Sequence, residues 1–258
     1  MLIFLLIIQI ITESLPISSS GHVALAQGFL QQHGYDVLVP SALLWLVHGI
    51  TLLLMLFIMR RSWWPLLCHP WRMRAMIVRM ALYGLCAEVI TVVVYGALYA
   101  RVHSCDGLAL GFLITTLVLW SLKFCKNVPQ YSSLFVWIMV GVAQGVAVIP
   151  GCSRLALTYA MARWLGYSGR HALALSFTMA LPLFAAASVY GAYDIFYSQA
   201  SRDMLTPLFF MGCALASVFA YGALLLTCHV MTTDRVRYFA GYMTLLFLLA
   251  VVVKLLQA

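Results

Sequence analysis

The segment Pro16-Ile17-Ser18-Ser19-Ser20-Gly21 interrupts an otherwise apolar run that extends over residues 1–30. Neither half of that run can cross a membrane, because a helix needs about 20 residues to span the hydrocarbon core. Proline and polar backbone at membrane depth are tolerated only inside protein or facing water. We therefore predict that residues 1–30 form a re-entrant hairpin of two short helices joined by this polar loop.

A second apolar run, residues 134–165, is interrupted in the same way by Pro150-Gly151-Cys152-Ser153-Arg154. The same argument predicts a second re-entrant hairpin there. Six other apolar runs approach the length of a membrane span and contain no such polar loop. They cover residues 40–59, 75–100, 108–122, 172–193, 207–230 and 238–256.

The composition agrees with a polytopic membrane protein. Of the 258 residues, 64% are apolar and only 9% are charged, whereas soluble domains have about a quarter charged. The mean hydropathy of +1.01 is spread along the whole chain. The net charge of +8 does not indicate nucleic acid as a partner, because the basic residues fall in short gaps between apolar runs. The seven scattered cysteines are interpreted as small hydrophobic residues, with no metal or disulfide role.

Charged residues in the gaps predict the orientation of the spans. Four arginines between residues 60 and 74 place that gap in the cytoplasm. If both hairpins return to the side from which they start, most other loop cations share this side. The cytoplasmic set is Arg60, Arg61, Arg72, Arg74, Lys123, Lys126, Arg163, Arg170, Arg235 and Arg237. The opposite side receives Asp36, Asp106, Asp194 and Asp203, with Arg101 and Arg202.

The hairpins and spans also recur along the chain. Pro16 and Pro150 are 134 residues apart, and the spans that start near residues 40, 75 and 108 recur near 172, 207 and 238. We predict one membrane domain, 1–258, with a first repeat over 1–126 and a second over 127–258. Three crossings in each half invert the second repeat, which brings interrupted helices from opposite sides to one midplane site. The expected fold is an all-α polytopic membrane protein with six transmembrane helices and two re-entrant helix-loop-helix hairpins.

The first hairpin carries residues suited to nucleophilic chemistry. Gln9 and Glu13 are four residues apart and share one helix face. Ser19 and His22 lie three apart at the start of the next helix, and a hydroxyl beside an imidazole is the minimal arrangement for an activated nucleophile. Glu13 could orient that imidazole, act as a base or hold a divalent cation.

The second hairpin suggests anion binding. Helices that begin at the two loops would direct their free N–H groups and positive dipole ends at one point, which favours phosphate. Arg154 adds a permanent cation with bidentate geometry. The alternative is that Glu13 and Arg154 form a buried structural ion pair. A charge at membrane depth costs about 2.5–3.5 kcal/mol, and such residues are usually functional, so we favour a site. We interpret His48 as a core histidine, with an approach to the site as the alternative. Glu88 could face Thr91 or the bundle interior, and we leave its role open between packing and function.

Both interrupted runs resemble signatures of one known family, the undecaprenyl-diphosphate phosphatases, also known as bacitracin-resistance proteins. In the first signature an E/Q-x-x-x-E pair leads into P-V-S-S-x-G-H, and this chain has Gln9-Ile-Ile-Thr-Glu13-Ser-Leu-Pro-Ile-Ser-Ser-Ser-Gly-His22. The second ends P-G-x-S-R-S-G-x-T, and this chain has Pro150-Gly-Cys-Ser-Arg154-Leu-Ala-Leu-Thr158. Ser176-Phe177 with Pro182 matches a further S-F-x-x-x-x-P stretch. The resemblance covers nearly the whole chain.

The resemblance implies a phosphatase of the bacterial plasma (inner) membrane that removes the terminal phosphate of undecaprenyl diphosphate, a C55 polyprenyl lipid. It implies Ser19 as nucleophile, Glu13 and His22 as acid/base residues, and Arg154 as the phosphate-binding cation. The supporting substrate-binding residues are Gln9, Ser18, Ser20, Gly151, Ser153 and Thr158. It also implies a divalent cation, Mg²⁺ or Ca²⁺, with Glu13 as its ligand, and a site open to the outer face.

The remaining expectations concern partners and one departure from the family pattern. The partners are the polyprenyl diphosphate and membrane lipids, without nucleic acid, and a homodimer is possible. The family's R-S-G is Arg154-Leu155-Ala156 here, so a hydroxyl and a glycine are missing. The alternative function is a polyprenyl-phosphate translocase that uses the same site without hydrolysis, because inverted repeats are common in transporters.

Overall fold

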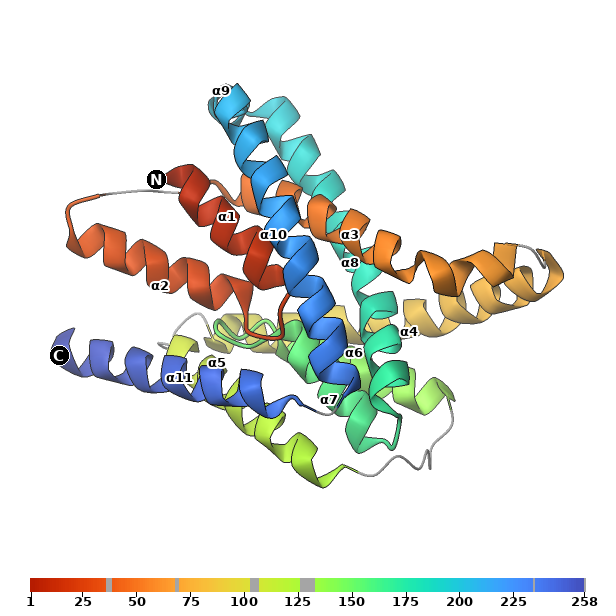
Figure 1. Ribbon diagram of the computed structural model, residues 1–258. Coiled ribbons are helices and arrows are strands. Elements are labelled where there is room, and N and C mark those ends of the chain that lie inside the picture. Colours follow the sequence, from red (N-terminus) through yellow and green to blue (C-terminus); the bar gives the residue numbers. More distant parts are fainter. Residues whose placement is uncertain (36–38, 68–69, 103–106, 126–132, 234, 258) are drawn as a thin grey trace.

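The chain folds into helices throughout the part that the structure describes (Figure 1). The structure, a computed structural model, describes residues 1–35, 39–67, 70–102, 107–125, 133–233 and 235–257. The helices are α1 (Leu2–Glu13), α2 (Ser19–Gln32), α3 (Ser41–Leu67), α4 (Pro70–Val102), α5 (Gly107–Ser121), the 3₁₀ turn η1 (Leu122–Phe124), α6 (Ser133–Val146), α7 (Arg154–Trp164), α8 (Gly169–Tyr197), α9 (Gln199–Asp203), α10 (Pro207–Thr232) and α11 (Arg237–Gln257).

Both interrupted runs fold as pairs of short helices joined by a loop, as the sequence predicts. In the first hairpin, α1 ends at Glu13 and α2 begins at Ser19 after an N-cap at Ser18. In the second, α6 ends at Val146 and α7 begins at Arg154 after an N-cap at Ser153. Each cap side chain accepts a hydrogen bond from a backbone N–H of the first turn, which satisfies one donor that the helix leaves free.

Helices of sufficient length and apolar character identify an integral membrane protein. Within the described residues, four stretches are long and apolar enough to cross a bilayer. They are Ser41–Arg60, Gly107–Phe124, Gly169–Tyr197 and Pro207–Thr232. The other two predicted spans correspond to α4 and α11, whose apolar stretches, Leu82–Leu98 and Arg237–Val253, are shorter. The count of six transmembrane helices therefore stays a prediction.

Large apolar side chains cover the outer surface of the helices, while small residues form their contacts. On α10, Leu215, Val218 and Phe219 are more than half exposed, whereas Ala216 and Ala220 are fully buried. A soluble protein rarely exposes so much apolar surface, and close backbone approach through small residues is typical of helix packing in lipid. The outer surface is therefore suited to acyl chains.

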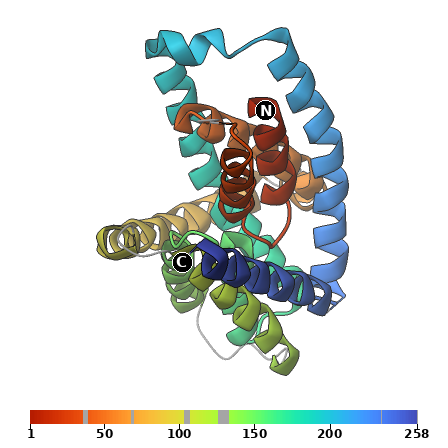
Figure 2. The same ribbon diagram turned by 90° about the vertical axis from the view of Figure 1, so that its left-hand side faces the viewer.

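The helix contacts relate the two halves of the chain to one another. α3 packs against α8, and α5 packs against α11. α1 of the first half contacts α10, and α6 of the second half contacts α4 (Figure 2). Exchanging the halves reproduces these pairings, which is the pattern expected of a repeat. The predicted boundary at residues 126/127 lies outside the described residues, so the two repeat domains and their inversion remain predictions.

Part of the predicted cytoplasmic set of cations lies together in the structure. Four of the predicted cytoplasmic residues, Lys123, Arg163, Arg235 and Arg237, line a single cavity. Asp194 lies near the C-terminal end of α8, and Asp203 is the last residue of α9, shortly before α10 begins. Both aspartates therefore belong to the end of the molecule that carries the α9 label in Figure 1. Of the residues used to assign sides, Asp36, Asp106 and Lys126 and the side chains of Arg61, Arg72 and Arg101 lie outside the described part.

Candidate active site

The two hairpin loops meet beside a cavity of about 440 Å³. Residues of α3, α4 and α8 complete its walls. Eight of the predicted site residues line it, namely Gln9, Glu13, Ser18, Ser19, Ser20, Ser153, Arg154 and Thr158. The predicted meeting of the loops is thus confirmed, and the structure brings together chemical groups that are about 140 residues apart in the sequence.

Glu13 is the centre of the polar contacts in this cavity. Its carboxylate accepts hydrogen bonds from the Ser19 hydroxyl and from the Arg154 guanidinium. Gln9 Nε2 donates a third hydrogen bond to Glu13 Oε2 over 3.0 Å. The side chain of Glu13 is only 7% exposed, so burial opposes its ionisation, but the cation and the two neutral donors stabilise the carboxylate. A buried carboxylate that accepts from a serine hydroxyl is placed to remove the proton of that hydroxyl.

The ion pair between Glu13 and Arg154, which the structural alternative predicted, is present, but Arg154 is not fully buried. Arg154 retains 21% exposure of its side chain and lines the cavity. Only its Nη2 donates to Glu13, so the other guanidinium N–H groups can bind a second anion. The Cζ atom of Arg154 also lies 4.2 Å from the ring centroid of Phe184 on α8. The aromatic face holds the guanidinium in place without using its hydrogen-bond donors.

Ser19 and Arg154 are each the first residue of a helix. Ser19 begins α2 and Arg154 begins α7, and both follow a serine N-cap. Backbone N–H groups in a first helical turn have no carbonyl partner in the helix, and the helix dipole adds positive partial charge. Two such ends beside one cavity favour a phosphate group there.

Unusual backbone conformations shape both loops. Ser18 has φ 63° and is the one non-glycine residue with positive φ among the described residues. This conformation directs the chain into α2 just before Ser19. Gly151 has φ +87°, and a Cβ atom there would collide with the backbone of Leu108. A Cβ atom on Gly21 would lie 3.1 Å from Cα of Gly151, so the loops touch through glycines. Gly151 thus shapes the site but does not line the cavity.

Further hydrogen bonds fix the second loop. Thr115 Oγ1 on α5 donates to the Gly151 carbonyl and accepts from the Ser153 N–H, at 3.3 and 3.0 Å. Thr158 Oγ1 donates to the Arg154 carbonyl over 3.0 Å. The Thr115 contacts hold the start of α7, and with it Arg154, against α5.

His22 does not form the pair with Ser19 that their spacing in the sequence had suggested. It does not line the cavity, and its ring nitrogens have other partners. Nδ1 lies 2.7 Å from the Ser18 carbonyl, and Nε2 lies 2.8 Å from the Tyr242 hydroxyl on α11. The rings of His22 and Tyr242 are stacked, with centroids 5.8 Å apart. His22 therefore contacts the backbone that precedes Ser19, and its acid/base role stays a prediction.

The histidine that faces the site is His48, for which the sequence favoured a core position. Its Nε2 lies 3.8 Å from Glu13 Oε2, and its Nδ1 lies 2.7 Å from the Leu44 carbonyl. His48 is on α3 and lines the cavity. The signal that could have found it was an imidazole in the middle of an apolar span, since polar groups at membrane depth usually face a functional interior.

Known proteins resemble this chain over nearly its whole length. The family model described as "Bacitracin resistance protein BacA" matches residues 2–249. The chain belongs to this family. A relative named undecaprenyl-diphosphatase, from Desulfosudis oleivorans, is 30% identical over 92% of this chain and 91% of its own length. Relatives of the same name from Protochlamydia amoebophila and Carboxydothermus hydrogenoformans are 30% and 28% identical over 93% and 98% of this chain, and over 92% and 95% of their own lengths.

Oxygen donors are available in this BacA-family site for a hard cation. Within the described ranges, no cluster of three His, Cys, Asp or Glu side chains is placed to hold a metal ion. The cavity does contain the Glu13 carboxylate and the amide of Gln9. It also contains Gln144, whose buried Oε1 has no hydrogen-bond partner among the described residues, while its Nε2 donates to Glu88 on α4 over 3.1 Å. Mg²⁺ is commonly held by one or two carboxylates together with substrate phosphates, so this donor set fits a cation shared with the substrate.

Proposed function

We propose that this BacA-family protein is an integral membrane phosphatase that hydrolyses undecaprenyl diphosphate to the monophosphate and inorganic phosphate. The observation that carries the proposal is the Ser19 hydroxyl donating to the buried Glu13 carboxylate, beside Arg154 and two helix N-termini. The relatives are named for the diphosphatase activity. The apolar outer surface suits an enzyme whose substrate is a membrane lipid.

In the first step, Ser19 Oγ attacks the terminal phosphorus while Glu13 takes the hydroxyl proton. The bond from that phosphorus to the bridging oxygen breaks, and the lipid leaves as its monophosphate. Arg154 and the N–H groups at the starts of α2 and α7 bind the phosphate oxygens. Their fixed positions stabilise the charge on the transferring group without reorganisation.

In the second step, water attacks the phosphoserine, and the bond between Ser19 Oγ and phosphorus breaks. Inorganic phosphate leaves and the Ser19 hydroxyl is restored. Glu13 returns the proton that it took in the first step to Ser19 Oγ, and both protons of the attacking water leave with the inorganic phosphate. Direct attack by water on the lipid diphosphate, with Ser19 only binding phosphate, is the mechanistic variant.

Glu13, Gln9 and Gln144 are the residues that would hold the divalent cation, Mg²⁺ or Ca²⁺. When bound, it would neutralise diphosphate charge and polarise the terminal phosphoryl group. We further propose that the enzyme resides in the bacterial inner membrane with its site open to the outer face. There it would recycle the lipid carrier for cell-wall synthesis and confer bacitracin resistance. The clustering of cations away from the hairpin loops supports this orientation.

The translocase alternative lacks support. The relatives carry the name of a diphosphatase, and a head-group carrier has no evident need for a serine hydroxyl held against a buried carboxylate.

Phosphate release from purified protein tests the proposed function. We expect release of inorganic phosphate from undecaprenyl diphosphate with Mg²⁺ or Ca²⁺, and loss of that release with excess EDTA. Undecaprenyl monophosphate is the control substrate and should release no phosphate. If neither cation supports release by protein that binds the lipid diphosphate, the proposal is wrong.

Replacing His48 and His22 in turn distinguishes their roles. We expect His48→Gln to lower kcat about 10- to 100-fold and to change the shape of the pH–rate profile, because this imidazole lies 3.8 Å from the Glu13 carboxylate. His22→Gln should lower kcat through the Ser18 backbone while leaving that shape unchanged. If His22→Gln changes the shape of the pH–rate profile and His48→Gln does not, the acid/base role belongs to His22 instead.

Leu155 lines the cavity where the family pattern has serine. We expect Leu155→Ser to raise kcat/KM about tenfold, because a hydrogen bond to a charged group contributes about 1.5–3 kcal/mol. Leu155→Ala is the matched control, since it removes the same bulk without adding a hydroxyl. Equal rates for the two variants would show that the missing hydroxyl does not limit this enzyme.

A further inference from the structure

A second cavity, of about 550 Å³, lies at the other end of α7 from the active site. It shares no lining residue with the first cavity. Arg154 begins α7 beside the active site, and Arg163, nine residues later, lines the second cavity. At 1.5 Å per helical residue these two arginines are separated by about 14 Å along the helix axis. The second cavity is therefore a separate feature of the fold.

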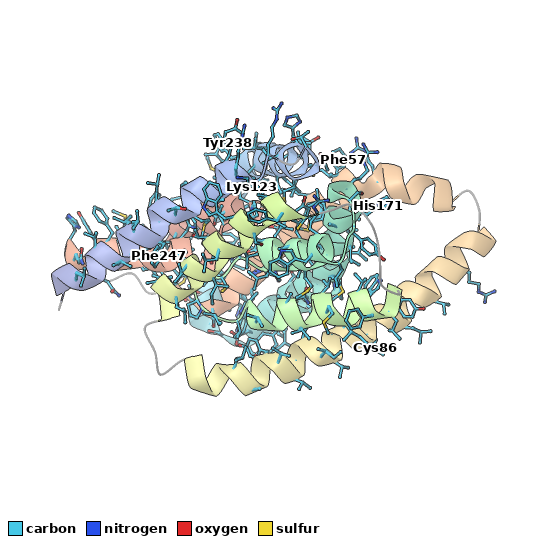
Figure 3. The ribbon with its side chains drawn as sticks, turned by 90° about the horizontal axis from the view of Figure 1, so that it is seen from below. Phe57, Cys86, Lys123, His171, Tyr238 and Phe247 are labelled. Carbon is cyan, nitrogen blue, oxygen red and sulfur yellow. The ribbon has the colours of Figure 1, made fainter. Side chains whose placement is uncertain are left out.

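Four of the ten residues that line this second cavity are cations. Lys123 comes from η1, Arg163 from α7, Arg235 from the loop before α11, and Arg237 from the start of α11. Figure 3, seen from below, shows Lys123 near Tyr238 at the start of α11. No carboxylate is among the described lining residues, and Asp234 lies outside the described part of the chain.

Three of these cations have exposed side chains without polar partners. Lys123, Arg235 and Arg237 are exposed, and none makes a side-chain hydrogen bond or ion pair with another described residue. Arg163 differs because it is 3% exposed and its Nη1 donates to the Tyr167 carbonyl over 2.9 Å. Its charge is fixed in the wall, while the other three can turn towards a ligand.

Hydrogen bonds between helices connect the walls of this cavity. The Tyr159 hydroxyl donates to the Met231 carbonyl over 2.6 Å, which joins α7 to α10. Trp120 Nε1 donates to Thr244 Oγ1 over 3.2 Å, which joins α5 to α11. Orientation in the membrane requires only that cations lie in cytoplasmic gaps. It does not require three separate chain segments to direct them into one cavity, where they repel one another.

We propose that this cavity binds a phosphate-bearing anion at the cytoplasmic membrane interface. Guanidinium groups match phosphate oxygens in bidentate geometry, and basic pockets between helices on this side of a membrane suit anionic head groups. The same chemistry fits two sources, namely the head group of an anionic phospholipid and free inorganic phosphate. Bound anion would remove the repulsion among the cations and stabilise the contact between α5, α7 and α11.

Thermal unfolding of the full-length protein in neutral detergent tests this site. The cavity variant combines Lys123→Gln, Arg235→Gln and Arg237→Gln. The control variant combines Arg74→Gln, Arg170→Gln and Arg202→Gln, three exposed cations outside the cavity with the same total charge. The probes are phosphatidylglycerol and inorganic phosphate. We expect saturating anion to raise the Tm of the control variant by about 5 °C and to leave the Tm of the cavity variant within about 1 °C.

Each arm of the experiment has a defined outcome. Loss of the phosphatidylglycerol shift in the cavity variant assigns a lipid head group, and loss of the phosphate shift assigns the free ion. Inorganic phosphate also fits the active site. The Tm shift that phosphate causes in the cavity variant is therefore compared with the shift that it causes in the control variant. Equal shifts in both variants with both probes would overturn the proposal. If the triple cavity variant does not fold, the single variant Arg237→Gln is measured instead, with at least a tenfold weaker apparent Kd expected.

Discussion

Replacing Ser19 by alanine is expected to lower the rate of phosphate release at least about 10³-fold while lipid diphosphate binding is retained. The hydroxyl is the nucleophile in the proposed mechanism, and its proton already lies on the hydrogen bond to Glu13. Binding should persist because Arg154 and the helix N-termini do not depend on this hydroxyl. The measurement is kcat in detergent micelles, together with equilibrium binding of the lipid diphosphate.

Ser20 provides the matched control for Ser19. It also carries a hydroxyl and lines the cavity, but the hydrogen-bond contact of its Oγ is a long one of 3.5 Å to Ser18. Ser20→Ala should therefore retain a rate within about tenfold of the wild type. A full rate in Ser19→Ala would exclude the phosphoserine and establish direct attack by water. Trapping of a phosphorylated Ser19 by acid quench would support the covalent route independently.

Replacing Arg154 by alanine is expected to lower kcat about 10³- to 10⁵-fold, the range for an arginine that stabilises a transferring phosphoryl group. The change removes the cation that faces the phosphate and leaves the Glu13 carboxylate buried without its charged partner. An unpaired buried charge is strongly destabilising, so the Tm of this variant should also fall. Steady-state kinetics and thermal unfolding measure the two effects.

Arg154→Lys separates the two contributions. Lysine keeps the charge beside Glu13 but loses the planar fork and its contact with the Phe184 ring. Its Tm should lie close to that of the wild type while its kcat remains at least about tenfold lower. A wild-type kcat in Arg154→Lys would mean that charge alone, without bidentate geometry, is sufficient.

The parts of the fold predictable from sequence are those encoded locally. Pro16 with three serines, and Pro150-Gly151, cannot continue a helix in an apolar setting, so the two hairpins could be located within a few residues. The starts of α2 and α7 are also encoded locally, because the structure has serine N-caps at Ser18 and Ser153, a residue type that favours this position. The meeting of the Glu13 and Arg154 loops was predicted from the inverted repeat of the two hairpins, and the scarcity of charge at membrane depth marked both residues as functional.

The contacts that sequence reasoning missed depend on how distant helices rotate against one another. His48 faces Glu13 because of the way α3 packs against α1 and α8, and an isolated helix does not specify that rotation. Similarly, His22 could be placed near Ser19 by helical spacing, but the Tyr242 hydroxyl that meets its ring lies 220 residues away. Glu88 contacts Gln144 across the α4–α6 interface rather than the neighbouring Thr91. Local periodicity contains no information about such partners.

The positions of Ser19 and Arg154 at the starts of two helices, 135 residues apart, have a consequence for biosynthesis. A nascent chain that has inserted only its first hairpin presents a hydroxyl and a carboxylate, but no counter-charge for a diphosphate. The reactive centre exists only after residue 154 has been synthesised and the start of α7 has reached the end of α1, where Arg154 meets Glu13. Hydrolytic competence is therefore a late product of assembly, and its onset reports that the first and second hairpins have come into contact.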